Sequence, residues 1–238
     1  PLTPEEVLAG KSALFCGDSL CMASTYDTEH QWWGWAGRIN KNYKLKSYKN
    51  VGVDGASVSN VRGTNTIIAQ VNNNKNGKFD FVILEGSTND GWDAVEVGKM
   101  VDKPASECVP GDFDLSTFAG GLENLFYYAE KYFTDSCIGY MFNYQLNSGT
   151  GRMKDMTEYL EEAKKICEKW NMPLLNLYEM EEFSVRNFAN KHARAAEKPV
   201  ASDGIHANSV GYDQLTPVVA QFMADIWNAK YPGGGAEA

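Results

Sequence analysis

The segment from Phe79 to Glu85 has the sequence FDFVILE and decides the fold. Its apolar residues do not alternate with polar ones, because Phe81 to Leu84 form an unbroken apolar run. A run of this kind is typical of a strand that is covered on both faces, as strands of parallel sheets are. The sequence therefore predicts a buried parallel strand here, followed directly by Gly86-Ser87-Thr88-Asn89-Asp90.

The rest of the chain alternates short apolar runs with segments of helical period. Strands are predicted at 12–16, 43–51, 79–85, 137–143 and 174–177, and helices at 31–40, 58–71, 118–133, 155–170 and 209–228. This alternation predicts an α/β domain of three layers, with helices on both faces of a parallel sheet. Residues 92–116 have no clear period and are predicted to be an insertion near the active site. Pro217 is expected to kink the last helix or delay its start.

Length and charge limit the classes of protein. The chain has 238 residues, which fits a single domain over 1–238, with 232–238 expected to be a flexible tail. The net charge of -9 argues against binding to nucleic acid or to an anionic membrane. No apolar run approaches the roughly 20 residues that cross a bilayer. We expect a soluble protein, in the cytoplasm or secreted with its signal removed, and the sequence leaves its oligomeric state open.

Five cysteines, an odd number without a C-x-x-C pair, favour free thiols over a disulfide scaffold or a zinc site. Three of them lie in apolar segments, where cysteine usually behaves as a small hydrophobic residue. A single bridge from Cys108 to another loop stays open as an alternative.

Chemically useful residues follow the first three predicted strands. Ser19 lies in Gly17-Asp18-Ser19-Leu20, Gly55 follows the second strand, and Asn89 follows the third. Because ligands of parallel sheets bind beyond the carboxyl ends of the strands, these residues are expected at one edge. Each has a plain structural alternative: Ser19 could cap a helix, Gly55 could form a turn, and Asn89 could bond its own backbone.

An Asp-x-x-His pair, Asp203 and His206, precedes the last predicted helix. On one helical turn this spacing places both side chains on the same side, so the carboxylate can orient the imidazole toward a nucleophile. The pair is weak evidence by itself, because Asp27 and His30 have the same spacing. The third histidine, His192, is interpreted as a surface residue of a helix.

Taken in order, these segments resemble the sequence blocks of the SGNH/GDSL hydrolases. Gly17-Asp18-Ser19-Leu20 resembles the first block, Gly55 the second-block glycine, 86–90 the third block with one extra residue, and Asp203 to His206 the last block. The resemblance spans residues 17 to 206 and implies a flavodoxin-like, five-stranded parallel sheet. It also favours His206 over His30, because the family places the pair just before the last helix.

The resemblance implies a serine esterase that forms an acyl-enzyme. Ser19 would be the nucleophile, His206 the general base and acid, and Asp203 the residue that orients His206. The N–H groups of Ser19 and Gly55 and the Asn89 side chain would form the oxyanion hole. Asp18 and Asp90 are expected to fix their loops, and no metal or cofactor is expected.

The substrate is predicted from tryptophans near the site. Trp32, Trp33 and Trp92 could stack on sugar rings, although aromatic residues at helical spacing are often core residues. We predict short-acyl esters of carbohydrates, acetyl esters above all, as the substrates. The alternatives are a lysophospholipase or thioesterase, an O-acyltransferase on the same triad and, least favoured, a non-catalytic carbohydrate-binding module.

Overall fold

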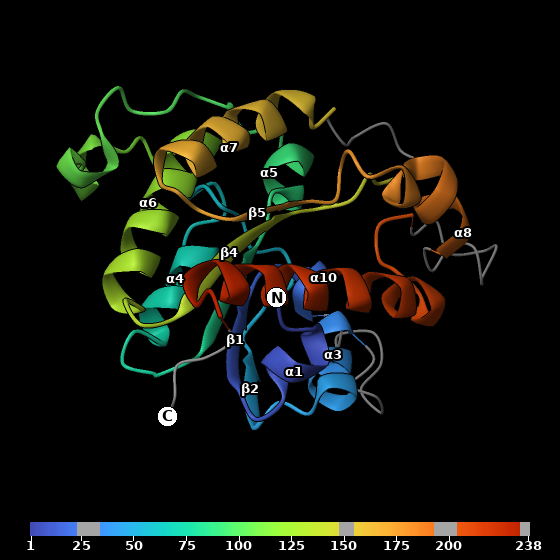
Figure 1. Cartoon of the computed structure of the whole chain (residues 1–238). Helices are drawn as coiled ribbons and strands as arrows, with labels where there is room; N and C mark the ends of the chain where they lie inside the picture. The colour runs from blue at the N-terminus through green and yellow to red at the C-terminus, as the bar shows by residue number, and fades with distance from the viewer. Residues whose placement is uncertain (23–33, 148–154, 193–203, 234–238) are drawn as a thin grey trace.

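A computed structural model describes residues 1–22, 34–147, 155–192 and 204–233. Its centre is a five-stranded sheet in the order β2-β1-β3-β4-β5, in which every neighbouring pair is parallel (Figure 1). The strands are β1 (Ser12–Cys16), β2 (Ser47–Asn50), β3 (Phe81–Glu85), β4 (Cys137–Phe142) and β5 (Leu174–Asn176). This confirms the predicted parallel sheet and its number of strands.

The unbroken apolar runs fill two separate cores. In β3, Phe81 and Ile83 belong to the core on one face, and Val82 and Leu84 belong to the core on the other. All four side chains are fully buried. Successive side chains of a strand point to opposite faces, so a strand between two helical layers needs apolar residues at every position.

Helices cover both faces of the sheet, as Figure 1 shows. One layer contains α1 (Pro4–Leu8), α3 (Trp35–Tyr43) and α10 (Ser209–Lys230), which contact one another. The other contains α4 (Ile67–Asn73), α6 (Phe118–Tyr132) and α7 (Thr157–Lys169). Shorter elements are α2 (Ser19–Met22), α5 (Thr88–Trp92), α8 (Asn190–His192), the 3-10 turns Ala105–Glu107, Pro110–Asp112 and Glu181–Phe183, and a π-helical turn at Val185–Ala189. Helix α10 starts at Ser209 and continues through Pro217, so the proline does not delay it.

The predicted helix over 58–71 is wrong over residues 58–66. Helix α4 begins at Ile67, with the Thr66 side chain capping it by accepting a hydrogen bond from Ala69 N (3.3 Å). The preceding residues form a loop, in which Asn60 N donates to Leu115 O (2.9 Å) and Gly63 has a φ of 65°. The buried Asp90 carboxylate holds the start of this loop by accepting hydrogen bonds from Val58 N (2.8 Å) and Ser59 N (2.9 Å).

The irregular segment 92–116 packs on the outside of α6 and α7. Two carboxylates of these helices accept hydrogen bonds from its backbone: Glu162 from Met100 N and Glu123 from Val101 N, both at 2.7 Å. Glu123 is fully buried and also pairs with Lys169. These hydrogen bonds to buried carboxylates hold the middle of the segment in place. The first residue of the segment, Trp92, lines the cavity described below.

The five cysteines all lie in described segments, and each is buried and free. This confirms the predicted free thiols and excludes the bridge from Cys108. Among the described residues, no helix combines the length and the apolar character needed to cross a membrane.

Candidate active site

Ser19 stands at the first residue of α2, three residues beyond the end of β1. The turn between them is held by Gln70, whose side-chain amide accepts from Gly17 N and donates to Gly17 O, each at 2.8 Å. A Cβ at position 17 would overlap the Glu85 carboxylate, so the turn requires glycine. Ser19 itself is 7% exposed, at the floor of a cavity.

His206 meets Ser19 from the other end of the chain. Its Nε2 lies 2.9 Å from Ser19 Oγ, within hydrogen-bonding distance. Residues 204–208 are not helical, which corrects the expectation that His206 lies on a helical turn. This segment is tied down instead, because Gly204 O accepts from Asn147 N (3.1 Å) and Ile205 O accepts from Tyr144 Oη (3.0 Å).

Three residues of the two Asp-x-x-His pairs lie outside the described residues. They are Asp203, the predicted partner of His206, and the alternative pair Asp27 and His30. His192 is half-buried in α8, where its Nε2 lies 3.1 Å from Gln214 Nε2, and it does not line the cavity.

The two further oxyanion candidates share the cavity with Ser19. The cavity has a volume of about 370 Å³ and is lined by Ser19, Asp54, Gly55, Arg62, Asn65, Thr88, Asn89, Trp92, Ile205 and His206. Gly55 has a φ of 76°, a conformation that residues with a side chain rarely adopt. The Asn89 side chain donates through Nδ2 to Ala56 O (2.9 Å) and to Asp18 Oδ2 (3.3 Å). The sequence-predicted serine, glycine, asparagine and histidine therefore lie around one hollow.

The polar rim of this cavity was not predicted from the sequence. Arg62 forms a two-pronged ion pair with Asp93, at 2.6 and 3.1 Å, and donates to Gly55 O at 3.0 Å. Asn65 donates to Asp54 O at 2.9 Å. Arg62 and Asn65 lie within the helix predicted over 58–71. The run Gly63-Thr64-Asn65-Thr66, which is rich in turn-forming residues and ends in a helix cap, is the sequence signal that indicates a loop instead.

Of the predicted substrate-binding tryptophans, Trp92 lines the cavity and is half-buried. Trp32 and Trp33 lie outside the described residues. Their neighbour Trp35 is a core residue, 1% exposed, with its ring 5.1 Å from that of Phe15.

Three carboxylic acids are fully buried beneath the cavity, namely Asp18, Glu85 and Asp90. Burial is the largest cause of the raised pKa of each, because it penalises the charged form. Asp18 Oδ1 accepts from Leu20 N at 2.8 Å, and Asp90 accepts from the backbone of 58–59. Both aspartates therefore hold their loops, as predicted.

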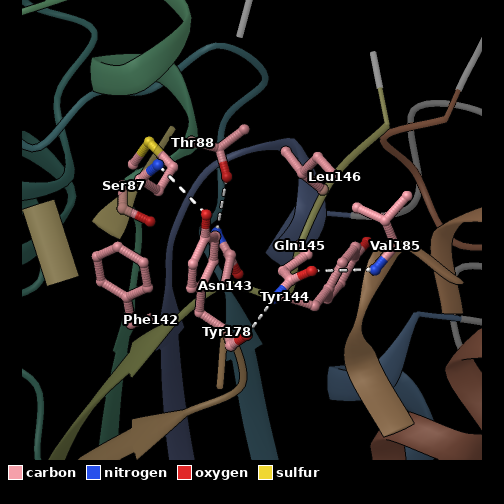
Figure 2. A pocket seen from close by; sticks show the side chains of 10 residues that line it. Ser87, Thr88, Phe142, Asn143, Tyr144, Gln145, Leu146, Tyr178 and Val185 are labelled. Atoms are coloured by element: carbon pink, nitrogen blue, oxygen red, sulfur yellow. Dashed lines mark hydrogen bonds between the residues drawn. The ribbon is translucent and has the colours of Figure 1, made fainter. Parts of the chain in front are cut away.

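A second, smaller cavity of about 80 Å³ shares Thr88 with the first. Figure 2 shows it from close by, with Asn143 donating a hydrogen bond to Thr88 Oγ1 (2.9 Å). Phe142, Leu146 and Tyr178 contribute apolar surface to it. Thr88 thus joins the carboxyl ends of β3 and β4, where the site is built.

The fold is that of GDSL-type lipases and esterases, which confirms the predicted resemblance at the level of the fold. The chain is similar to a possible lipase from Chitinophaga pinensis (TM-score 0.69, 17% identity, 91% of this chain and 99% of that one). It is also similar to a GDSL-like lipase from Bacteroides ovatus (TM-score 0.60, 18% identity, 91% and 99%) and to a psychrotrophic esterase from Pseudoalteromonas sp. (TM-score 0.54, 15% identity, 92% and 98%). No family model and no curated protein matches the sequence.

Proposed function

We propose that this protein is a serine esterase of the GDSL type. The observation that carries the proposal is the 2.9 Å contact between Ser19 Oγ and His206 Nε2 at the floor of an open cavity. A hydroxyl becomes a nucleophile when an adjacent base can take its proton. The similarity in fold to lipases and esterases supports the same reaction class.

In the proposed reaction, Ser19 Oγ attacks the ester carbonyl while His206 Nε2 takes its proton. The carbonyl oxygen becomes an oxyanion, stabilised by the N–H groups of Ser19 and Gly55 and by the Asn89 amide, each donor worth about 3 kcal/mol. His206 then returns the proton to the leaving alcohol, and water hydrolyses the acyl-enzyme by the reverse sequence. Asp203 is the proposed partner that orients the imidazole.

We propose short-acyl esters of carbohydrates, acetyl esters above all, as substrates. The cavity rim offers a flat aromatic face at Trp92 and polar groups at Asp54 and Asn65, which suit a ring that carries hydroxyl groups. Among the described lining residues, Trp92 and Ile205 supply the large apolar side chains. A long acyl chain would need a larger apolar surface than these two provide.

The test measures hydrolysis of p-nitrophenyl acetate, acetylated sugars and long-chain esters by the wild type and by S19A, with S116A as the control. Ser116 is exposed and bonds Asp114, away from the cavity. We expect acetyl esters to react, S19A to lose activity, S116A to keep it, and a fluorophosphonate probe to label only proteins with Ser19.

Each alternative has its own outcome. Reaction of long-chain esters alone would overturn the acetyl proposal in favour of a lysophospholipase or thioesterase. Transfer of the acyl group to an added sugar in preference to water would identify an O-acyltransferase. Absence of both turnover and labelling would overturn the catalytic proposal and favour a carbohydrate-binding module.

A further inference from the structure

Glu85, the last residue of β3, is fully buried directly beneath the nucleophile turn. Its Oε2 accepts a hydrogen bond from Asp18 N (2.9 Å), and its Oε1 accepts one from the Asn143 side chain. Because both partners donate, this arrangement favours a Glu85 that is an acceptor on both oxygens.

The Asp18 carboxyl is fully buried beside it, and its Oδ1 accepts a hydrogen bond from Leu20 N at 2.8 Å. Two buried carboxyl groups this close repel each other when both are ionised, so one of them keeps a proton. Both Glu85 oxygens accept close hydrogen bonds, whereas the contact of Asp18 Oδ2 with Asn89 Nδ2 is longer, at 3.3 Å, so we assign the proton to Asp18 Oδ2. Burial and the nearby Glu85 charge raise the pKa of Asp18, in agreement with this assignment.

The groups around this pair do not neutralise it by ion pairing. Within the described ranges, no lysine or arginine forms an ion pair with either carboxyl. The pKa values of the neighbouring Cys21 thiol and of the Tyr140 and Tyr144 phenols are raised well above their usual values, chiefly by burial, so these groups are neutral. Other titratable groups that act on this region are His206, Arg62, Asp90 and Tyr212, together with the Cys16 and Cys167 thiols, whose pKa values burial raises.

The acid pair is connected to the proposed oxyanion hole through one contact. Asn89 Nδ2, the proposed oxyanion donor, lies 3.3 Å from Asp18 Oδ2. Its other short contact is with Ala56 O at 2.9 Å. A neutral Asp18 holds this amide weakly, whereas an Asp18 carboxylate would compete with the substrate oxyanion for it and add negative charge nearby.

We propose that Asp18 and Glu85 form a buried acid pair that keeps a proton on Asp18 at neutral pH, and that Glu85 is thereby a positioning residue for Asn89. Loss of this proton turns Asn89 from an oxyanion donor into a partner of Asp18. The kinetic consequence rests on the proposed esterase function, but the proton on the pair does not.

The kinetic test compares pH profiles of kcat and KM for acetyl-ester hydrolysis. In E85Q, Asp18 loses the carboxylate that retains its proton, so we expect kcat at neutral pH to fall about 10-fold with little change in KM. We also expect the alkaline limb of the profile to move by at least about one unit to lower pH. In E85Q/D18N a neutral group returns to position 18, and kcat recovers toward that of the wild type.

The matched control is E123Q, which removes an equally buried carboxylate that pairs with Lys169 outside the cavity. Its pH profile should coincide with that of the wild type. Equal losses in E85Q and E85Q/D18N, with an unshifted profile, would show that Glu85 has only a structural part and would overturn the positioning proposal.

An infrared titration tests the proton without activity. A protonated carboxyl has a C=O stretching band that a carboxylate lacks, and we expect this band in the wild type at neutral pH and its loss on the alkaline side. This C=O band should weaken in E85Q and persist in E123Q. A protonated Asp90 would contribute the same band to the wild type and to both variants, so it does not affect the comparison. Absence of the band in the wild type at neutral pH overturns the proposal, even if no ester is hydrolysed or E85Q does not fold.

Discussion

Ser19 Oγ and His206 Nε2 lie 2.9 Å apart although the two residues are 187 positions apart along the chain. The parallel sheet produces this meeting, because β1 ends just before Ser19 and the segment that carries His206 crosses the same edge before α10. Hydrogen bonds from Tyr144 and Asn147 to 204–205 keep the histidine segment in place. The contact is therefore a property of the whole sheet rather than of a local motif.

Replacing the proposed base gives the first prediction. H206A should lose at least about 10³-fold in kcat for acetyl esters, because Ser19 then has no group to take its proton. H30A is the comparison, since Asp27 and His30 share the spacing of the proposed pair, and H30A should stay active. An inactive H30A together with an active H206A would show that the base has been assigned to the wrong histidine.

The second prediction concerns Asn89. N89A should lower kcat by about 10²- to 10³-fold with little change in KM, because the oxyanion that the amide stabilises exists only in the transition state. N60A, at an exposed position of the neighbouring loop, serves as the control. If N89A raised KM and left kcat intact, the side chain would bind the ground state and would not belong to the oxyanion hole.

The sequence could predict the sheet and the first residues of the site because these depend on local pattern. The run Phe81 to Leu84 requires cover on both faces, and glycine at 17 marks a tight turn after a buried strand. Ser19, Gly55 and Asn89 follow directly, since parallel strands bring their carboxyl ends to one edge.

Other parts depend on contacts that no local pattern carries. The loop before α4 is held by Asp90, from α5, which accepts hydrogen bonds from Val58 and Ser59, about thirty positions away. Arg62 consequently reaches the cavity instead of a helix surface. Glu85 looks like the polar end of a strand, yet it is fully buried and accepts a hydrogen bond from Asn143, 58 residues further along.

The third prediction tests the carbohydrate site. W92A should raise KM for acetylated sugars by about 10-fold, because the sugar ring loses the aromatic face on which it stacks. The same variant should hydrolyse p-nitrophenyl acetate almost as well as the wild type, and W92F should bind the sugars nearly normally. Equal losses on both substrates would show instead that Trp92 supports the reacting groups.

The fourth prediction follows from the buried acids. The pKa of Glu85 is raised by burial from 4.5 to about 7, and that of Asp18 is also raised, so the folded protein binds more protons than the unfolded chain above pH 4.5. The stability that these groups contribute is therefore present at acid pH and is lost as the pH rises toward 7 and beyond. The slope per group is at most about 1.4 kcal/mol per pH unit.

Urea unfolding between pH 5 and pH 8 measures this slope in the wild type and in E85Q. The free energy of unfolding should fall less steeply with pH in E85Q. The lowered pKa of His192 acts with the opposite sign near pH 6, but it is common to both proteins and cancels in the comparison. Identical slopes would contradict a raised Glu85 pKa.

The last prediction concerns the turn that presents Ser19. G17A should destabilise the fold by about 1–3 kcal/mol, because the added methyl group would overlap the Glu85 carboxylate and the Cys21 Cβ, both in the packed interior. It should also lower kcat, since relief of the overlap displaces the Ser19 backbone N–H. G111A is the matched control, as a Cβ there meets nothing within 4 Å. Thermal unfolding and acetyl-ester kinetics on both variants decide the matter. If G17A were as stable and as active as G111A, the turn could not be as tightly packed against Glu85 as these contacts require.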